Sequence, residues 1–155
     1  MRLEDILEML RKGDTALRVQ AIYALGDIGG DRVIAPLVYC ASRPEADVKG
    51  AAVEVLGQLR RRSTLPVLIE ALYDENPAVT ARAIEALGNF RDPSAVSHLL
   101  PFLDSGDGHL DAEAAISLGK IGAAEAEKKL LSLLTSVFPV TRKAAAEALG
   151  KLPLE

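Results

Sequence analysis

Ala24-Leu25-Gly26 is the stretch that decides the fold, because it returns four more times along the chain. The later copies are Leu56-Gly57, Ala86-Leu87-Gly88, Leu118-Gly119 and Ala148-Leu149-Gly150. The five glycines are therefore 31 residues apart each time. An unbroken period in this range is the sequence signature of a solenoid, in which short structural units stack on one another.

The residues around each copy of the motif form two helical patterns. We call the helix that ends near the glycine an A-type helix, and the helix that follows it a B-type helix. Apolar residues recur at helical spacing in both, with polar residues between them. The pattern predicts an all-α, right-handed α-solenoid (superhelix) of about ten helices, in a single domain over residues 1–155. Its expected parts are a lone B-type helix at 3–11, repeats at 15–45, 46–76, 77–107 and 108–138, and a lone A-type helix at 139–151.

The expected core is aliphatic, since the chain has only three Phe, three Tyr and no Trp. Small side chains at one position of every A-type helix should let the two helices of a hairpin approach closely. Leu130, Leu131 and Leu134 are predicted to point inward from the last B-type helix. The members of the small-residue column are Ala21, Ala52, Ala83, Ala114 and Ala145.

Two roles are open for the periodic glycines: close packing, or a left-handed turn at the helix end. Close packing is the favoured cause, because a separate turn glycine occurs three positions later. That glycine is present only as Gly29 and Gly122, and the corresponding positions elsewhere hold Arg60 and Arg91.

Composition limits the functional classes. The chain has 18 basic and 22 acidic residues, a formal charge of -4, which argues against nucleic-acid binding. No apolar run approaches the ~20 residues that a membrane span needs. Cys40 is the only cysteine, so a reducing compartment is expected. We predict a cytoplasmic protein without nucleic-acid or membrane partners.

Two stretches carry a resemblance to a known family. Residues 79–90, Val79-Thr80-Ala81-Arg82-Ala83-Ile84-Glu85-Ala86-Leu87-Gly88-Asn89-Phe90, resemble HEAT repeats of the short type found in phycobilisome-lyase-like proteins. Residues 142–150, Arg142-Lys143-Ala144-Ala145-Ala146-Glu147-Ala148-Leu149-Gly150, resemble that pattern most closely. The likeness covers essentially the whole chain, and it implies a stack of helical hairpins.

The resemblance also implies what the family does. Such repeats occur in scaffolds, adaptors, bilin lyases, a hydroxylase and DNA-repair enzymes. The family's basic residue early in the A-type helix is matched at Arg18, Lys49 and Arg142, whereas Thr80 and Asp111 depart from it.

The resemblance further implies that B-type helices line the concave side. Their outward positions hold Tyr39 and Tyr73 in neighbouring repeats, with Glu70 and Asp104 nearby in the pattern. Tyrosine is enriched at binding hot spots. We predict an acidic, tyrosine-bearing groove that takes a protein or peptide partner of basic character. The alternative is that both tyrosines lie on half-buried helix flanks, with the ring packed and the hydroxyl solvated.

A second hypothesis concerns the turns from A-type to B-type helices, which are basic. Arg60, Arg61, Arg62 and Arg91 could bind an acidic partner or phosphate. The alternative is that cations at the ends of A-type helices simply complement the helix dipole.

Signals for catalysis are weak. The only histidines, His98 and His109, are not an i, i+4 pair, and neither is followed by glutamate. The deoxyhypusine hydroxylase branch of these repeats uses paired His-Glu steps, so this activity is not expected. We predict no catalytic residue, no metal and no cofactor, and therefore a non-catalytic scaffold or adaptor. The alternative is a bilin-lyase-like enzyme or an accessory subunit of one.

The C-terminal end is expected to be less well covered. Val137-Phe138-Pro139-Val140 forms an apolar loop, and the last A-type helix has no B-type partner in the sequence. A monomer or weak homodimer through the C-terminal helix is expected, and a segment of a longer array is the alternative.

Overall fold

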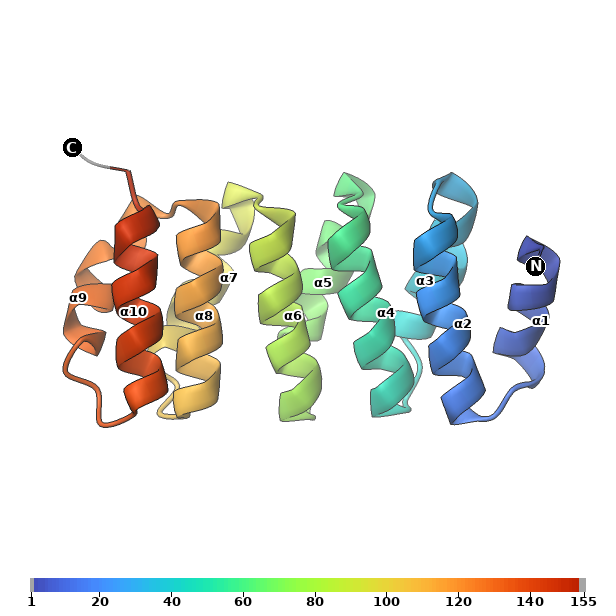
Figure 1. Ribbon diagram of the computed structural model, residues 1–155, viewed down its shortest axis with the longest axis horizontal. Helices are drawn as coiled ribbons and strands as arrows, with labels where there is room; N and C mark the ends of the chain where they lie inside the picture. Colours follow the sequence, from blue (N-terminus) through green and yellow to red (C-terminus); the bar gives the residue numbers. More distant parts are fainter. Residues whose placement is uncertain (1, 154–155) are drawn as a thin grey trace. The chain divides into compact units, whose positions relative to one another are not determined.

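A computed structural model describes residues 2–153, and the described part of the chain contains ten α-helices and no strand (Figure 1). Short 3₁₀ segments precede the later B-type helices. This confirms the predicted all-α class. The α-helices are α1 (Leu3–Lys12), α2 (Thr15–Ile28), α3 (Ile34–Ala41), α4 (Ala46–Leu59), α5 (Leu65–Ala71), α6 (Pro77–Phe90), α7 (Val96–Leu99), α8 (Gly108–Ile121), α9 (Glu127–Leu133) and α10 (Pro139–Lys151).

The chain divides into two compact units, with the boundary between Ala86 and Leu87 inside α6. In the first unit the A-type helices α2, α4 and α6 stand side by side, and the B-type helices α3 and α5 lie behind them (Figure 1). In the second unit α8 and α10 stand side by side, with α7 and α9 behind (Figure 1). Each unit is thus built of two layers of helices.

Three A-type helices, α2, α6 and α8, begin at side-chain caps. The carboxylate of Asp14 accepts the backbone N–H of Leu17 at 2.9 Å, and Asn76 Oδ1 accepts that of Ala78 at 2.9 Å. Such caps satisfy donors that the first helical turn leaves without a partner. Asp107 does the same for α8. These polar residues fix where the three helices start.

The periodic glycines allow neighbouring A-type helices to touch. A Cβ on Gly57 would lie 2.5 Å from the Cβ of Ala86, and one on Gly119 would lie 2.8 Å from the Cα of Ala148. Gly26 and Gly88 are equally tight against Val55 and Ser117. Close packing is therefore confirmed as the role of these four glycines. A Cβ on Gly150, by contrast, would have no heavy atom of the described chain within 4 Å.

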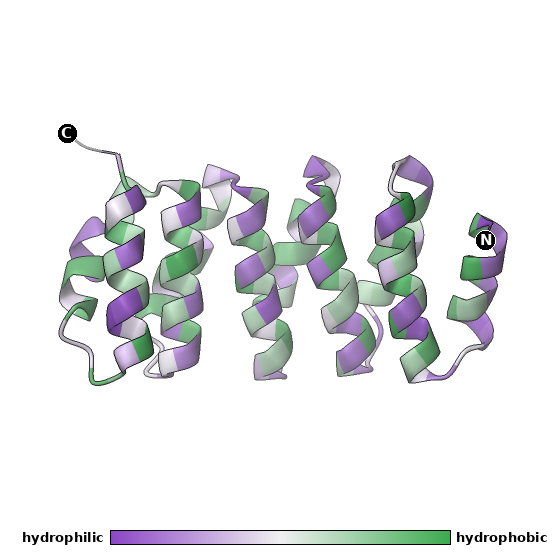
Figure 2. Cartoon of the chain, in the orientation of Figure 1, coloured by the Kyte–Doolittle hydropathy of each residue, from purple (hydrophilic) through white to green (hydrophobic). Residues whose placement is uncertain are grey.

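One leucine from each helix type forms the centre of every hairpin. The A-type leucines recur at the predicted position, and the B-type leucines recur with the same 31-residue interval. All eight are fully buried, and the alanine column beside them is also fully buried, as predicted. Figure 2 shows the alternation of apolar and polar residues along these helices. The leucines are Leu25, Leu56, Leu87 and Leu118 in A-type helices and Leu37, Leu68, Leu99 and Leu130 in B-type helices.

The prediction for the last B-type helix was partly wrong. Leu130 is buried, but Leu131 is 51% exposed and Leu134 is 38% exposed. Leu72 and Leu103, which correspond to Leu134 in earlier repeats, are almost fully buried. Ile69 and Leu100, which correspond to Leu131, are half-buried. The difference follows from position, because the earlier residues are covered by a following hairpin.

The B-type helices are less regular than predicted. Each of the later four starts with a 3₁₀ turn, and the helix expected over 93–104 is α-helical only at Val96–Leu99 before it becomes 3₁₀ over Leu100–Asp104. Pro101 explains the change, because proline has no N–H to donate to the carbonyl four residues earlier.

The basic residues early in the A-type helices, at the position matched by Arg18 and Lys49, form ion pairs with loop residues. Arg18 pairs with Glu45 at 3.9 Å, and Lys49 pairs with Asp74, so each reaches the loop after the next B-type helix. Thr80 instead donates to the carbonyl of Asp74 at 3.3 Å, in the loop before its own helix. Asp111 likewise accepts from Ser105 in its preceding loop.

Candidate functional site

The two tyrosines of the predicted groove are on the surface of the first unit. Tyr39, on α3, is 62% exposed, and Tyr73, just after α5, is 66% exposed. The half-buried arrangement, considered as the alternative, is therefore not what the structure shows. Both rings therefore reach the solvent.

Tyr39 lies beside a cation. The guanidinium of Arg43 donates to the Tyr39 hydroxyl at 3.2 Å, and its central carbon lies 5.6 Å from the ring centroid. This geometry is a cation–π contact combined with a hydrogen bond. Tyr39 is thus held by an arginine one turn further along the chain.

Tyr73 borders a hollow of about 530 Å³ between α3 and α5. Glu70 and Asp74 line the same hollow, and Lys49 forms an ion pair with Asp74 there. The hydrogen bond from Lys49 lowers the pKa of the Asp74 carboxyl below its ordinary value. Glu70 is exposed, so its carboxylate faces solvent beside Tyr73.

Asp104, the fourth predicted residue, belongs to the second unit. It ends the 3₁₀ segment after α7, and its carboxylate accepts from Lys129 at 2.5 Å. The structure therefore brings Tyr39, Glu70 and Tyr73 into one unit, and it places Asp104 in the other.

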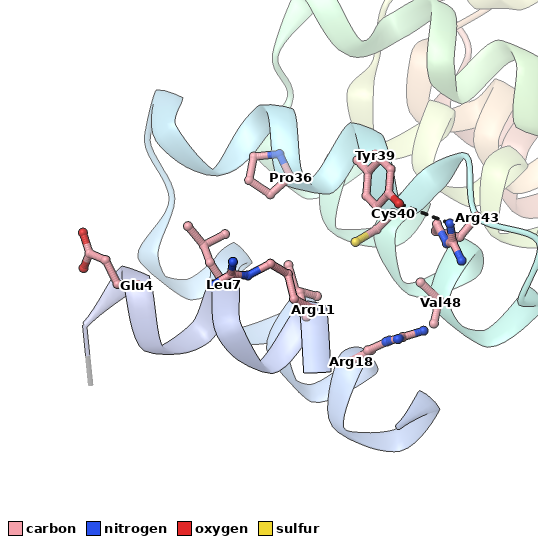
Figure 3. A pocket seen from close by; sticks show the side chains of 10 residues that line it. Glu4, Leu7, Arg11, Arg18, Pro36, Tyr39, Cys40, Arg43 and Val48 are labelled. Atoms are coloured by element: carbon pink, nitrogen blue, oxygen red, sulfur yellow. Dashed lines mark hydrogen bonds between the residues drawn. The ribbon is translucent and has the colours of Figure 1, made fainter. Parts of the chain in front are cut away.

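A second cavity, of about 540 Å³, lies between α1 and α3. Helices α1 and α3 form its main walls, and α2 and α4 each contribute one side chain (Figure 3). Its walls combine aliphatic groups with three arginines, and Tyr39 and Cys40 also line it. The lining residues are Glu4, Leu7, Leu10, Arg11, Arg18, Pro36, Tyr39, Cys40, Arg43 and Val48.

Two of these arginines share one carboxylate. Arg18 Nη1 lies 3.9 Å from Glu45 Oε1, and Arg43 Nε lies 3.6 Å from Glu45 Oε2. Both distances exceed that of a hydrogen bond. Within the described residues, Arg18 Nε and Glu45 Oε2 are buried without a hydrogen-bond partner. Burial raises the pKa of the Cys40 thiol, while the charges of Arg18 and Arg43 oppose that rise.

Sequence reasoning missed this cavity. The sequence predicts Tyr39 as an outward residue of a B-type helix and matches Arg18 to a family position, but it does not connect them. Arg43 follows α3, outside every periodic pattern. Only the arrangement of four helices brings these side chains together.

The basic turn residues have structural roles of their own. Arg60 and Arg91 adopt left-handed backbone conformations, with φ of 53° and 61°. Arg61 pairs with Asp31 at 3.1 Å, and Arg62 begins the 3₁₀ turn before α5. Arg60, Arg61 and Arg62 lie in the first unit and Arg91 lies in the second. Their binding of an acidic partner stays a prediction.

Neither metal ligands nor membrane helices are evident in the part of the chain that the structure describes. Residues 2–153 contain no group of three or more His, Cys, Asp and Glu side chains that could hold a metal ion. None of the described helices is long and apolar enough to span a bilayer.

The fold and the register of its glycines define a class of protein, the α-solenoid built of helical hairpins. The sequence pattern of HEAT repeats matches residues 34–116 and 97–155, and that of the PBS lyase HEAT-like repeat matches residues 17–38. The chain therefore belongs to the HEAT-repeat family, as the resemblance predicted.

One curated relative is the phycocyanobilin lyase subunit alpha of Synechococcus elongatus. It is 34% identical over 70 residues, which are 45% of this chain and 26% of the relative. The chain thus matches about a quarter of the length of that protein.

Solved structures share the fold. The complex of CpcE and CpcF of phycocyanin lyase from Nostoc sp. PCC7120 superimposes with a TM-score of 0.87 at 23% identity, covering 100% of this chain and 66% of that one. A designed armadillo repeat protein in complex with the peptide (KR)4 gives a TM-score of 0.72 at 19% identity, covering 97% and 82%. Human deoxyhypusine hydroxylase gives 0.56 at 18% identity, covering 97% and 84%. Identities this low establish the shared fold alone.

Proposed function

We propose that the protein is a non-catalytic scaffold or adaptor that binds a protein or peptide on its B-type helix surface. The observation that carries the proposal is the pair of exposed rings in one unit, Tyr39 on α3 and Tyr73 just after α5. Large aromatic side chains that reach solvent beside hollows are the anchors that interfaces favour. Glu70 supplies the acidic group for a basic partner, and Asp104 supplies one in the second unit.

The known structures support a basic partner by analogy. A designed armadillo repeat protein of the same fold class was solved with the peptide (KR)4. In the present chain, Glu70 and Tyr73 offer a carboxylate and a ring face to such a cationic side chain.

A titration with the fluorescent peptide (KR)4 tests this proposal. We expect saturable binding that weakens by about tenfold in the Tyr39→Ala/Tyr73→Ala double variant and in Glu70→Gln, since a lost hot-spot contact costs about 1–2 kcal/mol. Tyr23→Phe is the matched control, because Tyr23 lies on the A-type layer and hydrogen-bonds to Glu54. Undiminished binding by the double variant would rule this surface out.

A second candidate function is that of a bilin-lyase-like enzyme or an accessory subunit of one. The match to phycocyanobilin lyase subunit alpha favours it. Mixing the purified protein with phycocyanobilin should then change the absorbance spectrum of the bilin. An unchanged spectrum at saturating protein would contradict this candidate.

We also propose a cytoplasmic location, on the single cysteine of the chain and the rarity of disulfides in that compartment. A weak homodimer through α10 is proposed because Ala146 and Gly150 are exposed there, whereas the corresponding residues Ala115 and Gly119 are buried. Leu131 and Leu134 of α9 are exposed at the same end of the repeat pattern.

A further inference from the structure

The cavity between α1 and α3 has the composition of a small-molecule site. We propose that it binds a small apolar molecule that carries a carboxylate, with the carboxylate at Arg18 and Arg43 and the apolar body along Leu7 and Pro36. This goes beyond the proposed binding of a protein partner, because it assigns a separate ligand of defined chemistry to the first unit.

The two arginines at the cationic end of the cavity are not hydrogen-bonded to the carboxylate that they share. Arg18 and Arg43 converge on the single carboxylate of Glu45, and neither is within hydrogen-bond distance of it. Arg18 Nε is buried and has no acceptor among the described residues. A buried guanidinium donor without an acceptor is unfavourable. Both side chains line the cavity and are partly exposed, 30% for Arg18 and 38% for Arg43. A ligand carboxylate can therefore accept from their exposed guanidinium nitrogens at this end of the cavity.

The remainder of the cavity is mainly aliphatic, and its two ends differ in charge. Figure 3 shows Arg18, Arg43 and Val48 at one end, and Glu4, Leu7 and Pro36 toward the other. Glu4 would repel a carboxylate, so the anionic group of a ligand is favoured at the arginine end. Arg11 lies between the ends and adds a third positive charge.

The size of the cavity favours a small molecule. Small-molecule sites usually enclose about 300–1,000 Å³ and combine apolar walls with a few polar groups that fix orientation. The cavity of about 540 Å³, with its aliphatic side chains and clustered arginines, meets both conditions. The exposed ring of Tyr39 also lines the cavity, and Arg43 donates a hydrogen bond to its hydroxyl.

Calorimetric titration with decanoate tests the proposal. We expect saturable binding of decanoate, binding of decanol that is weaker by about tenfold or more, and no binding of decyltrimethylammonium, because a charged hydrogen bond is worth about 1.5–3 kcal/mol. Arg18→Gln and Arg43→Gln should each weaken decanoate binding by about tenfold or more. Arg43 is the safer variant for folding, since its side chain is 38% exposed.

Two control variants make the result specific. Arg142→Gln removes the same charge from the second unit and should leave decanoate binding unchanged. Tyr73→Ala should also leave it unchanged, which separates this site from the proposed peptide surface.

The proposal is overturned if decanoate does not saturate a site, if the cationic detergent binds as well, or if both arginine variants bind like the wild type. It is equally overturned if the cavity takes only a peptide with a free C-terminal carboxylate and not decanoate.

Discussion

Arg60 and Arg91 are the two non-glycine residues with left-handed backbone conformation in the described chain. Both occupy the position after an A-type helix that Gly122 fills after α8. A side chain in this conformation brings its Cβ close to the backbone, which costs about 1–2 kcal/mol. The sequence showed that arginine replaces the turn glycine at these two positions. That the arginines keep the left-handed conformation of Gly122 is seen only in the structure.

We expect Arg60→Gly to stabilise the protein by about 0.5–1 kcal/mol, because glycine adopts φ of 53° without that cost. The free energy of unfolding in urea measures the effect. Arg61→Gly is the matched control, since Arg61 has φ of -83° and gains nothing from glycine. A lower free energy of unfolding in Arg60→Gly would contradict this expectation. It would mean that the arginine side chain stabilises the fold by more than its left-handed backbone destabilises it.

At the scale of the helix, the glycine column determines how closely A-type helices pack. Gly57 of α4 lies against Ala86 of α6, and Gly119 of α8 lies against Ala148 of α10. In each pair the partner residue follows the glycine by 29 positions. Small residues on both sides leave the two backbones near contact, so a single added methyl group cannot be accommodated without movement.

Gly57→Ala is expected to lower the free energy of unfolding by about 1–3 kcal/mol through overpacking. Gly150→Ala should instead raise it by up to about 1 kcal/mol, because alanine is the better helix former and the site is open. Chemical denaturation of both variants checks the contrast. Equal effects of the two substitutions would show that the packing of neighbouring helices is not the cause.

The A-type helices were predicted more accurately than the B-type helices, for physical reasons. Four of the five A-type helices start at a side-chain cap or a proline that the sequence displays, α4 being the exception, and α10 has the predicted bounds of 139–151. The B-type helices open with 3₁₀ turns, which have no comparable sequence signal. Pro101 was visible in the sequence, but its effect on hydrogen bonding was not foreseen.

At the scale of the whole molecule, the candidate site could be predicted only in part. Counting along the outward face of one helix type identified Tyr39 and Tyr73, because their exposure follows from helical periodicity. The arginine cavity could not be found in this way, since Arg11, Arg18 and Arg43 come from three segments that meet only in the fold. Asp104 shares the periodic column with Tyr73, but it belongs to the other unit.

Association through α10 is the prediction at this scale. We expect the weight-average mass in sedimentation experiments to rise above the 16.5 kDa of one chain as concentration increases. Ala146→Glu should abolish the rise, because a charge buried at an apolar contact is unfavourable. Ala16→Glu, at another exposed alanine, is the control. A constant mass of 16.5 kDa for the wild type would contradict the homodimer.

The open space beside Gly150 has a consequence for engineering. A synthetic 31-residue hairpin could be grafted after α10, with alanine or serine placed 29 positions beyond this glycine, as Ala148 and Ser117 are placed beyond Gly119 and Gly88. Leu134 and Ala146 would then be covered as their counterparts Leu103 and Ala115 already are. The exposed face of α10 is thus a surface onto which a further hairpin can be packed without changing any existing residue.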